Sequence, residues 1–361
     1  MNDRLLHLRE KMRNSSLDAM LISNPDNRRY ISGFTGSAGY LLITFEEAIL
    51  ATDFRYIEQS TQQASDFEIF RISGTVNWLS NLLDRLQIKK LGFEASDLTV
   101  NLHALMLDEI IKVKSIQPNF IPTTELVEPL RMIKDSNEIA LISKAVELAD
   151  DAFLAVSPNI KVGDSELLVA WQIEKTMKEM GADSISFDTI VASGPNGAKP
   201  HHQPSERKIQ AGEPIVIDMG AKFQGYCSDM TRTICIGEPE PKLKEIYDIV
   251  LGAQLTAIAT VSSIMHSGDA DKIARDIINE AGYGDLFGHS LGHGIGLEVH
   301  ENPRVGPGGN DLLVDGTIFT IEPGIYISGW GGVRIEDTVI MENGSVRTLN
   351  KSHKLQNPRS S

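Results

Sequence analysis

The hydrophobic pattern of the first third of the chain alternates between short apolar runs and amphipathic segments. Short runs bounded by polar or turn residues predict strands, and apolar residues that repeat every three to four positions predict helices. A helix is predicted over residues 4–12, followed by strands over 18–23, 39–53 (two strands) and 67–72. A second helix over 76–86 and a strand over 89–94 follow. This alternation predicts an α/β domain with a mostly buried sheet.

A change of pattern near residue 128 predicts a domain boundary. Asp135 and Glu138 have the spacing of a capping box, and an apolar face of one helix follows them, at Ile139, Ile142, Val146 and Ala149. We therefore predict an N-terminal domain over residues 1–127 and a second domain over residues 128–361. Further helices are predicted at 165–180, 241–265 and 270–281, the last beginning at Asp269 and ending at Gly282, with strand-rich segments around them.

Composition and charge exclude several classes of function. The 361 residues are 41% hydrophobic and 23% charged, with a formal net charge of -15, which argues against a nucleic-acid surface. No apolar run reaches the length of about 18 residues that a membrane span needs. Two cysteines, Cys227 and Cys235, form no disulfide framework and suggest a reducing compartment. We expect a soluble cytoplasmic protein that binds neither nucleic acid nor membrane.

The segment 215–236, IVIDMGAKFQGYCSDMTRTICI, has the outline of a β-hairpin with two acids in apolar runs. A turn through 221–225 would bring Asp218 and Asp229 opposite each other. Facing carboxylates in an apolar setting repel each other and lose hydration. Two isolated aspartates are more often exposed hairpin acids, so this segment alone leaves their role open.

Other charged positions in apolar surroundings change that interpretation. The segment GHSLGHGIGLEVH (288–300) holds three histidines, which in isolation also fit a glycine-rich loop with incidental histidines. Glu322 ends the apolar run TIFTIEPGIYI, and Glu336 lies within GGVRIEDTVIM. Four carboxylates at apolar positions would raise one another's pKa values and destabilise the fold without cations. Two divalent ions offset that charge, and oxygen ligands with one imidazole suit manganese, iron or cobalt, with zinc also possible.

The motifs IDMGAKFQGYCSDMTRT, LGHGIGLEVH, TIEPGIY and VRIEDT, in this order, resemble those of the "pita-bread" metallopeptidases. The chain is most similar to the Xaa-Pro branch of that family, aminopeptidase P and prolidase, and the resemblance covers its whole length. It implies an N-terminal α/β creatinase-like domain. A pita-bread catalytic domain with a curved antiparallel sheet flanked by helices would follow.

The resemblance implies five metal ligands and two divalent metal ions. Asp218 would bind one ion, Asp229 and Glu336 would bridge both, and His293 and Glu322 would complete the other. The usual metal of the family is manganese, so we expect Mn(II), with Co(II), Zn(II) and Fe(II) as the alternatives.

The resemblance also implies accessory catalytic residues. In ASGPNGAKPHH (192–202), His201 matches the histidine that contacts substrate, with His202 as the fallback. His289 and His300 match two accessory histidines. Arg334 matches an arginine beside the bridging glutamate. Structural roles remain open for these positions: packing support for His289, His300 and His201, and a structural ion pair for Arg334.

Two further expectations concern neighbours of the ligands. Thr231 is expected to support Asp229 through a hydrogen bond. Cys227 and Cys235 are interpreted as small strand residues rather than metal ligands, because they lack CxxC spacing.

The main hypothesis is a dinuclear-metal Xaa-Pro aminopeptidase whose substrate is a peptide with proline at the second position. The metal ions would activate a water molecule and polarise the scissile carbonyl. Glu322 would pass a proton toward the leaving proline nitrogen, His300 would hold the oxyanion, and His201 would contact substrate near the scissile bond. The resemblance further implies a homodimer.

Three alternatives remain open. An Xaa-Pro dipeptidase, or prolidase, would need a cation for the free prolyl carboxylate, preferably a bidentate arginine. Between His300 and Glu322 the only basic residue is Arg304, and a sufficient clamp is not evident from the sequence. A metal-free hydrolase of the creatinase kind and a non-catalytic peptide-binding module are the others, and both would lack the complete ligand set.

Overall fold

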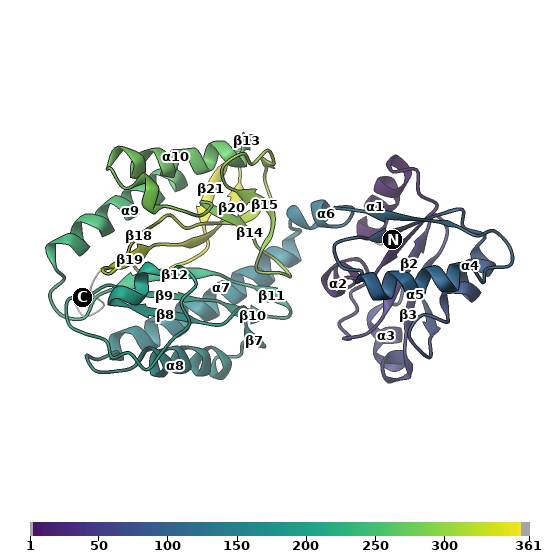
Figure 1. Cartoon of the computed structure of the whole chain (residues 1–361), viewed down its shortest axis with the longest axis horizontal. Coiled ribbons are helices and arrows are strands. Elements are labelled where there is room, and N and C mark those ends of the chain that lie inside the picture. Colours follow the sequence, from purple (N-terminus) through teal and green to yellow (C-terminus); the bar gives the residue numbers. More distant parts are fainter. Residues whose placement is uncertain (1–2, 355–361) are drawn as a thin grey trace. The chain divides into compact units, whose positions relative to one another are not determined.

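The structure, a computed structural model, describes residues 3–354. The chain divides into two compact units, Met1–Arg131 and Met132–Ser361, and each is described by itself (Figure 1). The sequence placed the boundary at residue 128, which is the first residue of the short helix α6 (Glu128–Met132) at this division.

The first unit is built on one six-stranded mixed sheet with the order β4-β3-β2-β1-β5-β6. All four residues of β1 are buried, as its apolar run predicts. β1 pairs antiparallel with β2 and parallel with β5. The strands are β1 (Ala19–Ile22), β2 (Tyr40–Thr44), β3 (Ala48–Thr52), β4 (Glu68–Arg71), β5 (Lys90–Glu94) and β6 (Asn119–Thr123).

The helices of the first unit were predicted only in part. The amphipathic pattern correctly predicted α1 and α4, but it missed α2, α3 and α5. The segment of α2 is mostly polar, and its helix is specified by its ends: Asn24 caps the first turn and Gly33 ends it at φ 77°. The helices are α1 (Asp3–Asn14), α2 (Pro25–Ser32), η1 (Phe54–Tyr56), α3 (Ile57–Gln63), α4 (Leu79–Leu86) and α5 (Val100–Ile110).

The second unit encloses its strands between two pairs of helices. Figure 1 shows α9 (Pro241–Thr260) and α10 (Ser267–Glu280) on one side of the strands and α7 (Ser136–Val156) and α8 (Glu166–Glu179) on the other. Single-turn helices η2 (Ser157–Asn159), η3 (Gly194–Ala198) and η4 (Gly284–Leu286) join these elements.

The strands of the second unit form several small sheets, which are mainly antiparallel. The sheet β12-β9-β8 comprises β8 (Ile190–Ser193), β9 (Ile215–Met219) and β12 (Met230–Ile234). The sheet β15-β14-β17-β20-β21 comprises β14 (Gly292–Gly294), β15 (Glu301–Val305), β17 (Ile318–Ile321), β20 (Asp337–Glu342) and β21 (Ser345–Thr348). Shorter groups are β11-β10-β7, β18-β19 and β13-β16, with β7 (Ser184–Ile185), β10 (Ala221–Phe223), β11 (Tyr226–Cys227), β13 (Met265–His266), β16 (Leu312–Leu313), β18 (Gly324–Ile327) and β19 (Gly331–Arg334).

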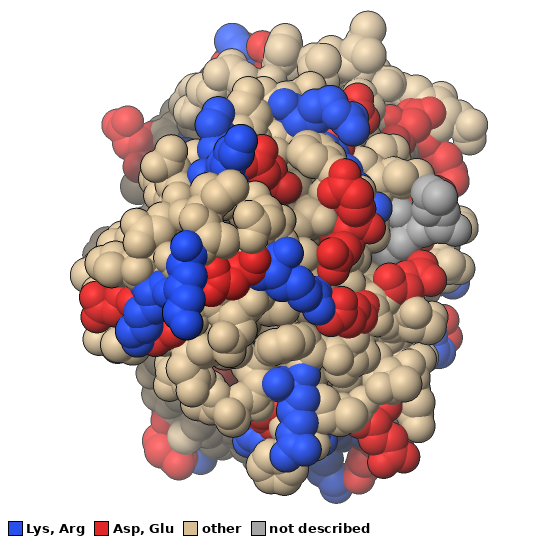
Figure 2. Space-filling view, turned by 90° about the vertical axis from the view of Figure 1, so that its right-hand side faces the viewer, with Lys and Arg blue, Asp and Glu red and all other residues tan. Residues whose placement is uncertain are grey.

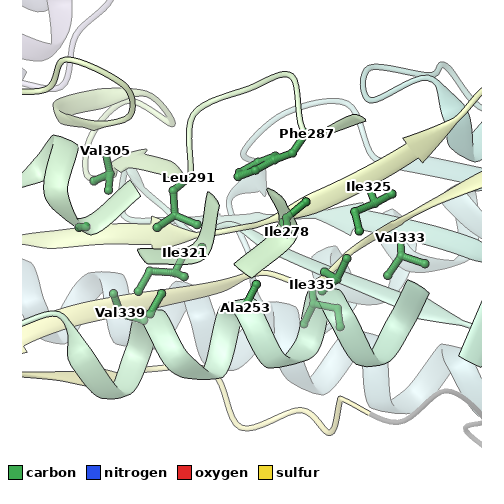
Figure 3. Close-up of a cluster of buried hydrophobic side chains, with 14 of the residues drawn as sticks. Ala253, Ile278, Phe287, Leu291, Val305, Ile321, Ile325, Val333, Ile335 and Val339 are labelled. Atoms are coloured by element: carbon green, nitrogen blue, oxygen red, sulfur yellow. The ribbon is translucent and has the colours of Figure 1, made fainter. Parts of the chain in front are cut away.

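A buried apolar cluster joins α9 and α10 to the strands that carry two of the predicted ligands. Figure 3 shows Ala253 of α9 and Ile278 of α10 in one cluster with Ile321 of β17 and with Ile335, which lies between β19 and β20. Ile321 and Ile335 are fully buried, and each directly precedes a predicted metal ligand. Burying these side chains therefore fixes the backbone from which Glu322 and Glu336 project.

The ends of two helices test the predicted caps. The capping box of Asp135 and Glu138 is confirmed: both reciprocal hydrogen bonds are present at the start of α7. The predicted start of α10 at Asp269 is wrong, because the helix begins at Ser267 and Asp269 lies in its first turn. There the acidic side chain still interacts favourably with the helix dipole, so an acid in the first turn was mistaken for a cap.

The surface carries both signs of charge. Figure 2 shows acidic and basic side chains interspersed over one face of the described residues, so the net charge of -15 is not gathered into a single acidic area there. Among residues 3–354, every helix is too short or too polar to cross a membrane.

Candidate metal centre

β9 and the start of β12 position the first two predicted ligands. The register places Asp218 opposite Thr231, whereas Asp229 precedes β12 and is 5% exposed. The expectation that the two aspartates face each other is therefore wrong. A Cβ on Gly220 would lie 2.0 Å from Ser228 O, so the two backbones touch at this point and the strand ladder is interrupted. The charge of Asp218 nevertheless contributes to raising the pKa of Asp229, so the two acids lie in one site.

His293 in β14 and Glu322 directly after β17 lie on neighbouring strands. His293 Nε2 is 3.3 Å from Glu322 Oε1 and 3.5 Å from Asp229 Oδ2. The other ring nitrogen, Nδ1, lies 3.1 Å from Gly294 O. A proton on Nδ1 satisfies that carbonyl and leaves the Nε2 lone pair directed at the carboxylates, the tautomer that a metal ligand needs.

Thr320 is a residue that the sequence did not single out, and it links these two ligands. Its Oγ1 accepts from His293 N at 3.1 Å and donates to Glu322 Oε1 at 3.1 Å. A threonine in an apolar strand carries no sequence signal of such a role, because strand propensity alone explains it. Its two bonds fix the spacing between the imidazole and the carboxylate.

The sequence suggested that Glu336 lies inside one strand, but it lies between β19 and β20. The chain changes partner here, since β19 pairs with β18 and β20 pairs with β17. Thr231 Oγ1 donates to Glu336 Oε2 at 2.6 Å, and Glu336 N donates to Thr231 O at 3.0 Å. Thr231 therefore supports Glu336, and the expectation that it supports Asp229 is wrong; Thr338 Oγ1 instead donates to the Asp229 carbonyl at 2.8 Å.

Arg334 is the buried cation of the site. It is 4% exposed, and its Nη2 is 2.6 Å from Asp218 Oδ2. Its Nη1 donates to Tyr326 Oη at 2.9 Å, and the same hydroxyl lies 2.8 Å from His289 Nε2. His289, Tyr326, Arg334 and Asp218 thus form a continuous chain of polar contacts. Sequence reasoning missed Tyr326, because a tyrosine in an apolar strand is ordinarily a packing residue.

The charges of the cluster shift several pKa values. Burial first, and then the carboxylates around them, raise the pKa values of Asp229 and Glu336 well above their usual range. Burial alone would raise the pKa of Glu322, but the contact with His293 lowers it, and the same contact raises the pKa of His293. Negative charge is therefore in excess: one arginine and one imidazole face four carboxyl groups.

The donor set fits a divalent metal. Among the described residues, Asp218 Oδ1, Asp229 Oδ1 and Glu336 Oε1 are buried oxygens without a hydrogen-bond partner. Asp229, His293 and Glu336 each offer a ligand atom, and these atoms lie within 4.8 Å of one another. Buried carboxylate oxygens rarely lack a donor in a folded protein, and a cation held by oxygens and one imidazole supplies what they lack.

The accessory histidines lie around this cluster. The rings of His293 and His300 have centroids 4.3 Å apart, and the pKa of His300 is lowered by partial burial and then by His293 and His201. The structure therefore brings His201 near His300. His202, the fallback, instead donates from Nε2 to Glu166 at 2.9 Å. His289 also packs edge-to-face on Phe287, so it combines a packing contact with its polar one.

Two family models together match nearly the whole chain. Residues 140–343 match the metallopeptidase family M24, and residues 4–133 match the creatinase/prolidase N-terminal domain. A curated relative, an Xaa-Pro dipeptidase of Pyrococcus horikoshii, is 41% identical over 355 residues, which are 98% of this chain and 98% of the relative.

Solved structures of similar proteins cover nearly the whole chain. The Xaa-Pro dipeptidase from Bacillus anthracis is 43% identical with a TM-score of 0.95, over 98% of this chain and 99% of that one. The X-Pro aminopeptidase from Thermotoga maritima is 37% identical with a TM-score of 0.87, over 96% of this chain and 99% of that one.

Proposed function

The chain belongs to metallopeptidase family M24, and from that premise we propose that it is an Xaa-Pro dipeptidase, which hydrolyses the bond before a C-terminal proline. The predicted family and fold are confirmed: a creatinase-like N-terminal domain precedes a pita-bread catalytic domain. The choice of activity differs from the main hypothesis drawn from the sequence. Similar proteins that are named Xaa-Pro dipeptidases favour its alternative.

The observation that carries this proposal is the register of β14 and β15. It places Arg304 directly opposite His293, and opposite residues of an antiparallel pair project from the same face of the sheet. Arg304 Nε donates to Ser290 Oγ at 3.1 Å, which orients the guanidinium. The planar fork of an arginine suits a carboxylate. Arg304 is thus our candidate for the prolyl carboxylate clamp, which the sequence alone did not make evident.

The five predicted ligands keep their proposed roles. Asp218 would help to hold one metal ion and His293 and Glu322 the other, while Asp229 and Glu336 would contribute to both. Bound divalent ions, for which Mn(II) is the first choice and Co(II), Zn(II) and Fe(II) the alternatives, supply an activated water molecule and polarise the scissile carbonyl.

The remaining steps fall to side chains. Glu322 accepts at a carboxylate oxygen the proton that the attacking water loses, and delivers it to the proline nitrogen as the carbonyl carbon–nitrogen bond breaks. That nitrogen has no hydrogen in the peptide and needs one to leave as an amine. His300 donates to the oxyanion and His201 contacts the substrate beside it. Arg334 holds Asp218 in place through its 2.6 Å contact, and His289 acts through Tyr326 on the same arginine.

A cytoplasmic location and a homodimer belong to the proposal as well. Cys227 and Cys235 are buried and are not joined in a disulfide, as is usual in a reducing compartment. The homodimer rests on the family resemblance, and sedimentation of the metal-loaded protein tests it.

The substrate test compares an Xaa-Pro dipeptide with an Xaa-Pro-Yaa tripeptide, each incubated with Mn(II)-loaded protein, and uses Xaa-Ala as the control. We expect the dipeptide to have a kcat/KM at least about 10-fold above that of the tripeptide, because a site built for a carboxylate rejects a substrate that lacks it there. A chelator should abolish the cleavage and Mn(II) restore it. Faster cleavage of the tripeptide would overturn the dipeptidase and restore the aminopeptidase.

Substitution of Arg304 tests the clamp itself. We expect Arg304→Gln to raise KM for Xaa-Pro by roughly 10- to 100-fold, the value of a hydrogen bond to a charged group. The slower hydrolysis of an Xaa-Pro amide, which has no carboxylate, should be unchanged. Arg304→Lys keeps the charge without the fork and should recover part of the loss. Equal losses on the acid and the amide would remove Arg304 from this role.

A further inference from the structure

Glu166, the first residue of α8, is a buried carboxylate outside the metal centre. Its side chain is fully buried. Within residues 3–354, the donors to its carboxylate all come from residues 193–205. We call this segment the histidine loop, because it carries His201 and His202. Burial alone would raise the pKa of Glu166, but donors from Ser205, Ser193 and His202 lower it to about 2. The carboxyl group of Glu166 is therefore an anion at neutral pH.

The two carboxylate oxygens of Glu166 hold opposite ends of the histidine loop. Oε1 accepts from Ser193 N at 2.8 Å and from Ser193 Oγ at 2.7 Å, at the start of the loop. Oε2 accepts from Ser205 N at 3.1 Å, from Ser205 Oγ at 2.7 Å and from His202 Nε2 at 2.9 Å, near its end. Asn196 Nδ2 lies 3.1 and 3.2 Å from the two oxygens. A single carboxylate thus closes the loop on itself.

The histidine loop is also held on its other side, by β19. A Cβ on Gly332 would lie 2.1 Å from Gly197 O, so the loop and the strand pack backbone to backbone. Arg334, at the end of the same strand, donates from Nη1 to Pro200 O at 3.4 Å. His201 therefore sits between Pro200, which faces the metal centre, and His202, which faces Glu166.

We propose that Glu166 is a positioning residue for the reaction: by closing the histidine loop it holds His201 where it meets the substrate. The inference rests on the proposed function, in which His201 contacts substrate. Within residues 3–354 the hydrogen bonds of the Glu166 carboxylate go to the histidine loop and to none of the proposed metal ligands, so we expect Glu166 to act through the loop. Displacement of a substrate-contacting group by about 1 Å costs about 100-fold in rate.

Glu166→Gln is the sharpest substitution because it keeps the shape of the side chain. Glutamine replaces one carboxylate oxygen by an NH2 group, and either orientation sets that group against a backbone N–H, of Ser193 or of Ser205. Two donors cannot satisfy each other, so one end of the loop is released in either orientation. Glu179→Gln, at the exposed end of the same helix, is the matched control.

A double-mutant cycle with His201→Ala tests the proposal. We expect Glu166→Gln to lower kcat/KM for Xaa-Pro by roughly 10- to 100-fold in the wild-type background. In the His201→Ala background the same change should cost less than about 2-fold, because residues that act as one unit are not additive. Equal losses in both backgrounds would show that Glu166 acts through general stability, and would overturn the proposal.

Hydrogen exchange supplies a second readout that needs no substrate. Glu166→Gln should speed exchange of the amide of Ser193 or of Ser205, at whichever end of the loop is released, while leaving the amides of β14 and β17 protected. Glu179→Gln should change neither set. Unchanged exchange at both Ser193 and Ser205 would overturn the positioning role of Glu166 even if the wild-type protein cleaves Xaa-Pro. Failure of the wild-type protein to cleave Xaa-Pro would overturn the proposed function. Hydrogen exchange would then still test whether Glu166 holds the histidine loop.

Discussion

Glu336→Gln is expected to lower kcat/KM for an Xaa-Pro dipeptide by more than about 100-fold. Loss of a residue that merely orients a metal ligand costs about 10- to 100-fold, and Glu336 is proposed to contact both ions itself. Glutamine keeps the volume of the side chain and leaves an acceptor for Thr231 Oγ1, which lies at 2.6 Å. The substitution therefore removes one negative charge and one ligand oxygen with little change in packing.

The same substitution should change stability in opposite directions with and without metal. Glu336 is 1% exposed, and burial and the neighbouring acids raise its pKa well above the usual range. Removing this carboxylate relieves repulsion, so the metal-free variant should unfold at a higher temperature than the metal-free wild type. At a free metal concentration 100 times the dissociation constant, the wild type gains about 2.7 kcal/mol per site, and the variant should lose most of that gain.

The control for this pair of measurements is Glu342→Gln. Glu342 ends the strand that Glu336 precedes, but it is exposed and paired with Arg347 at 2.7 Å. It should leave activity, metal content and both unfolding temperatures nearly unchanged. An active Glu336→Gln enzyme with full metal content would remove Glu336 from the ligand set.

The residues proposed as ligands were predictable because each breaks a local pattern. Glu322 and Glu336 interrupt apolar runs, and a carboxylate at such a position needs a partner. The pairings among these residues were not predictable, since they depend on registers between distant strands. Thr231 bonds Glu336, which lies 105 positions away, and local spacing suggested Asp229 instead.

Arg304 shows the same limit on a smaller scale. The sequence shows that it follows His300, but the bulge at His293 and Gly294 decides which residue it opposes. Glu166 carried no signal at all, because an acid at the start of a helix is ordinary there. Its donors come from the histidine loop, and only the folded chain brings them to one carboxylate. In the first unit the apolar pattern predicted the strands of the sheet except β6 and missed α2, α3 and α5.

Arg232→Met is expected to lower the free energy of unfolding of the second unit by about 3–5 kcal/mol. Arg232 and Asp337 form a buried ion pair at 2.8 Å, with side chains 2% and 0% exposed. Arg232 Nη2 also donates to Ser352 O at 3.1 Å, and Nη1 donates to the carbonyls of Thr231 and Glu336. Methionine fills the space but removes one cation from the buried Asp337 carboxylate, which keeps its contacts with Lys354 at 2.6 Å and Gln254 at 3.0 Å. It also removes one donor from each of the three carbonyls.

Calorimetry should show this loss as a fall of roughly 6–20 °C in the unfolding transition of the second unit, at 2–4 °C per kcal/mol for a unit of this size. Arg347→Met is the matched control, because its ion pair with Glu342 is half exposed and is worth less than about 1 kcal/mol. The double variant Arg232→Met/Asp337→Leu should regain part of the stability lost in Arg232→Met, since it removes a buried carboxylate that has lost one of its two cations. The other cation, Lys354, is 20% exposed and can turn to solvent.

Activity separates the two roles that the structure gives to Arg232. Because Nη1 holds the carbonyls of Thr231 and Glu336, the double variant should regain stability without regaining full activity: the backbone that carries Glu336 has still lost its donor. Full recovery of both would mean that Arg232 serves the ion pair alone. Recovery of neither would mean that the cost lies in those carbonyls rather than in the weakened pairing of Asp337.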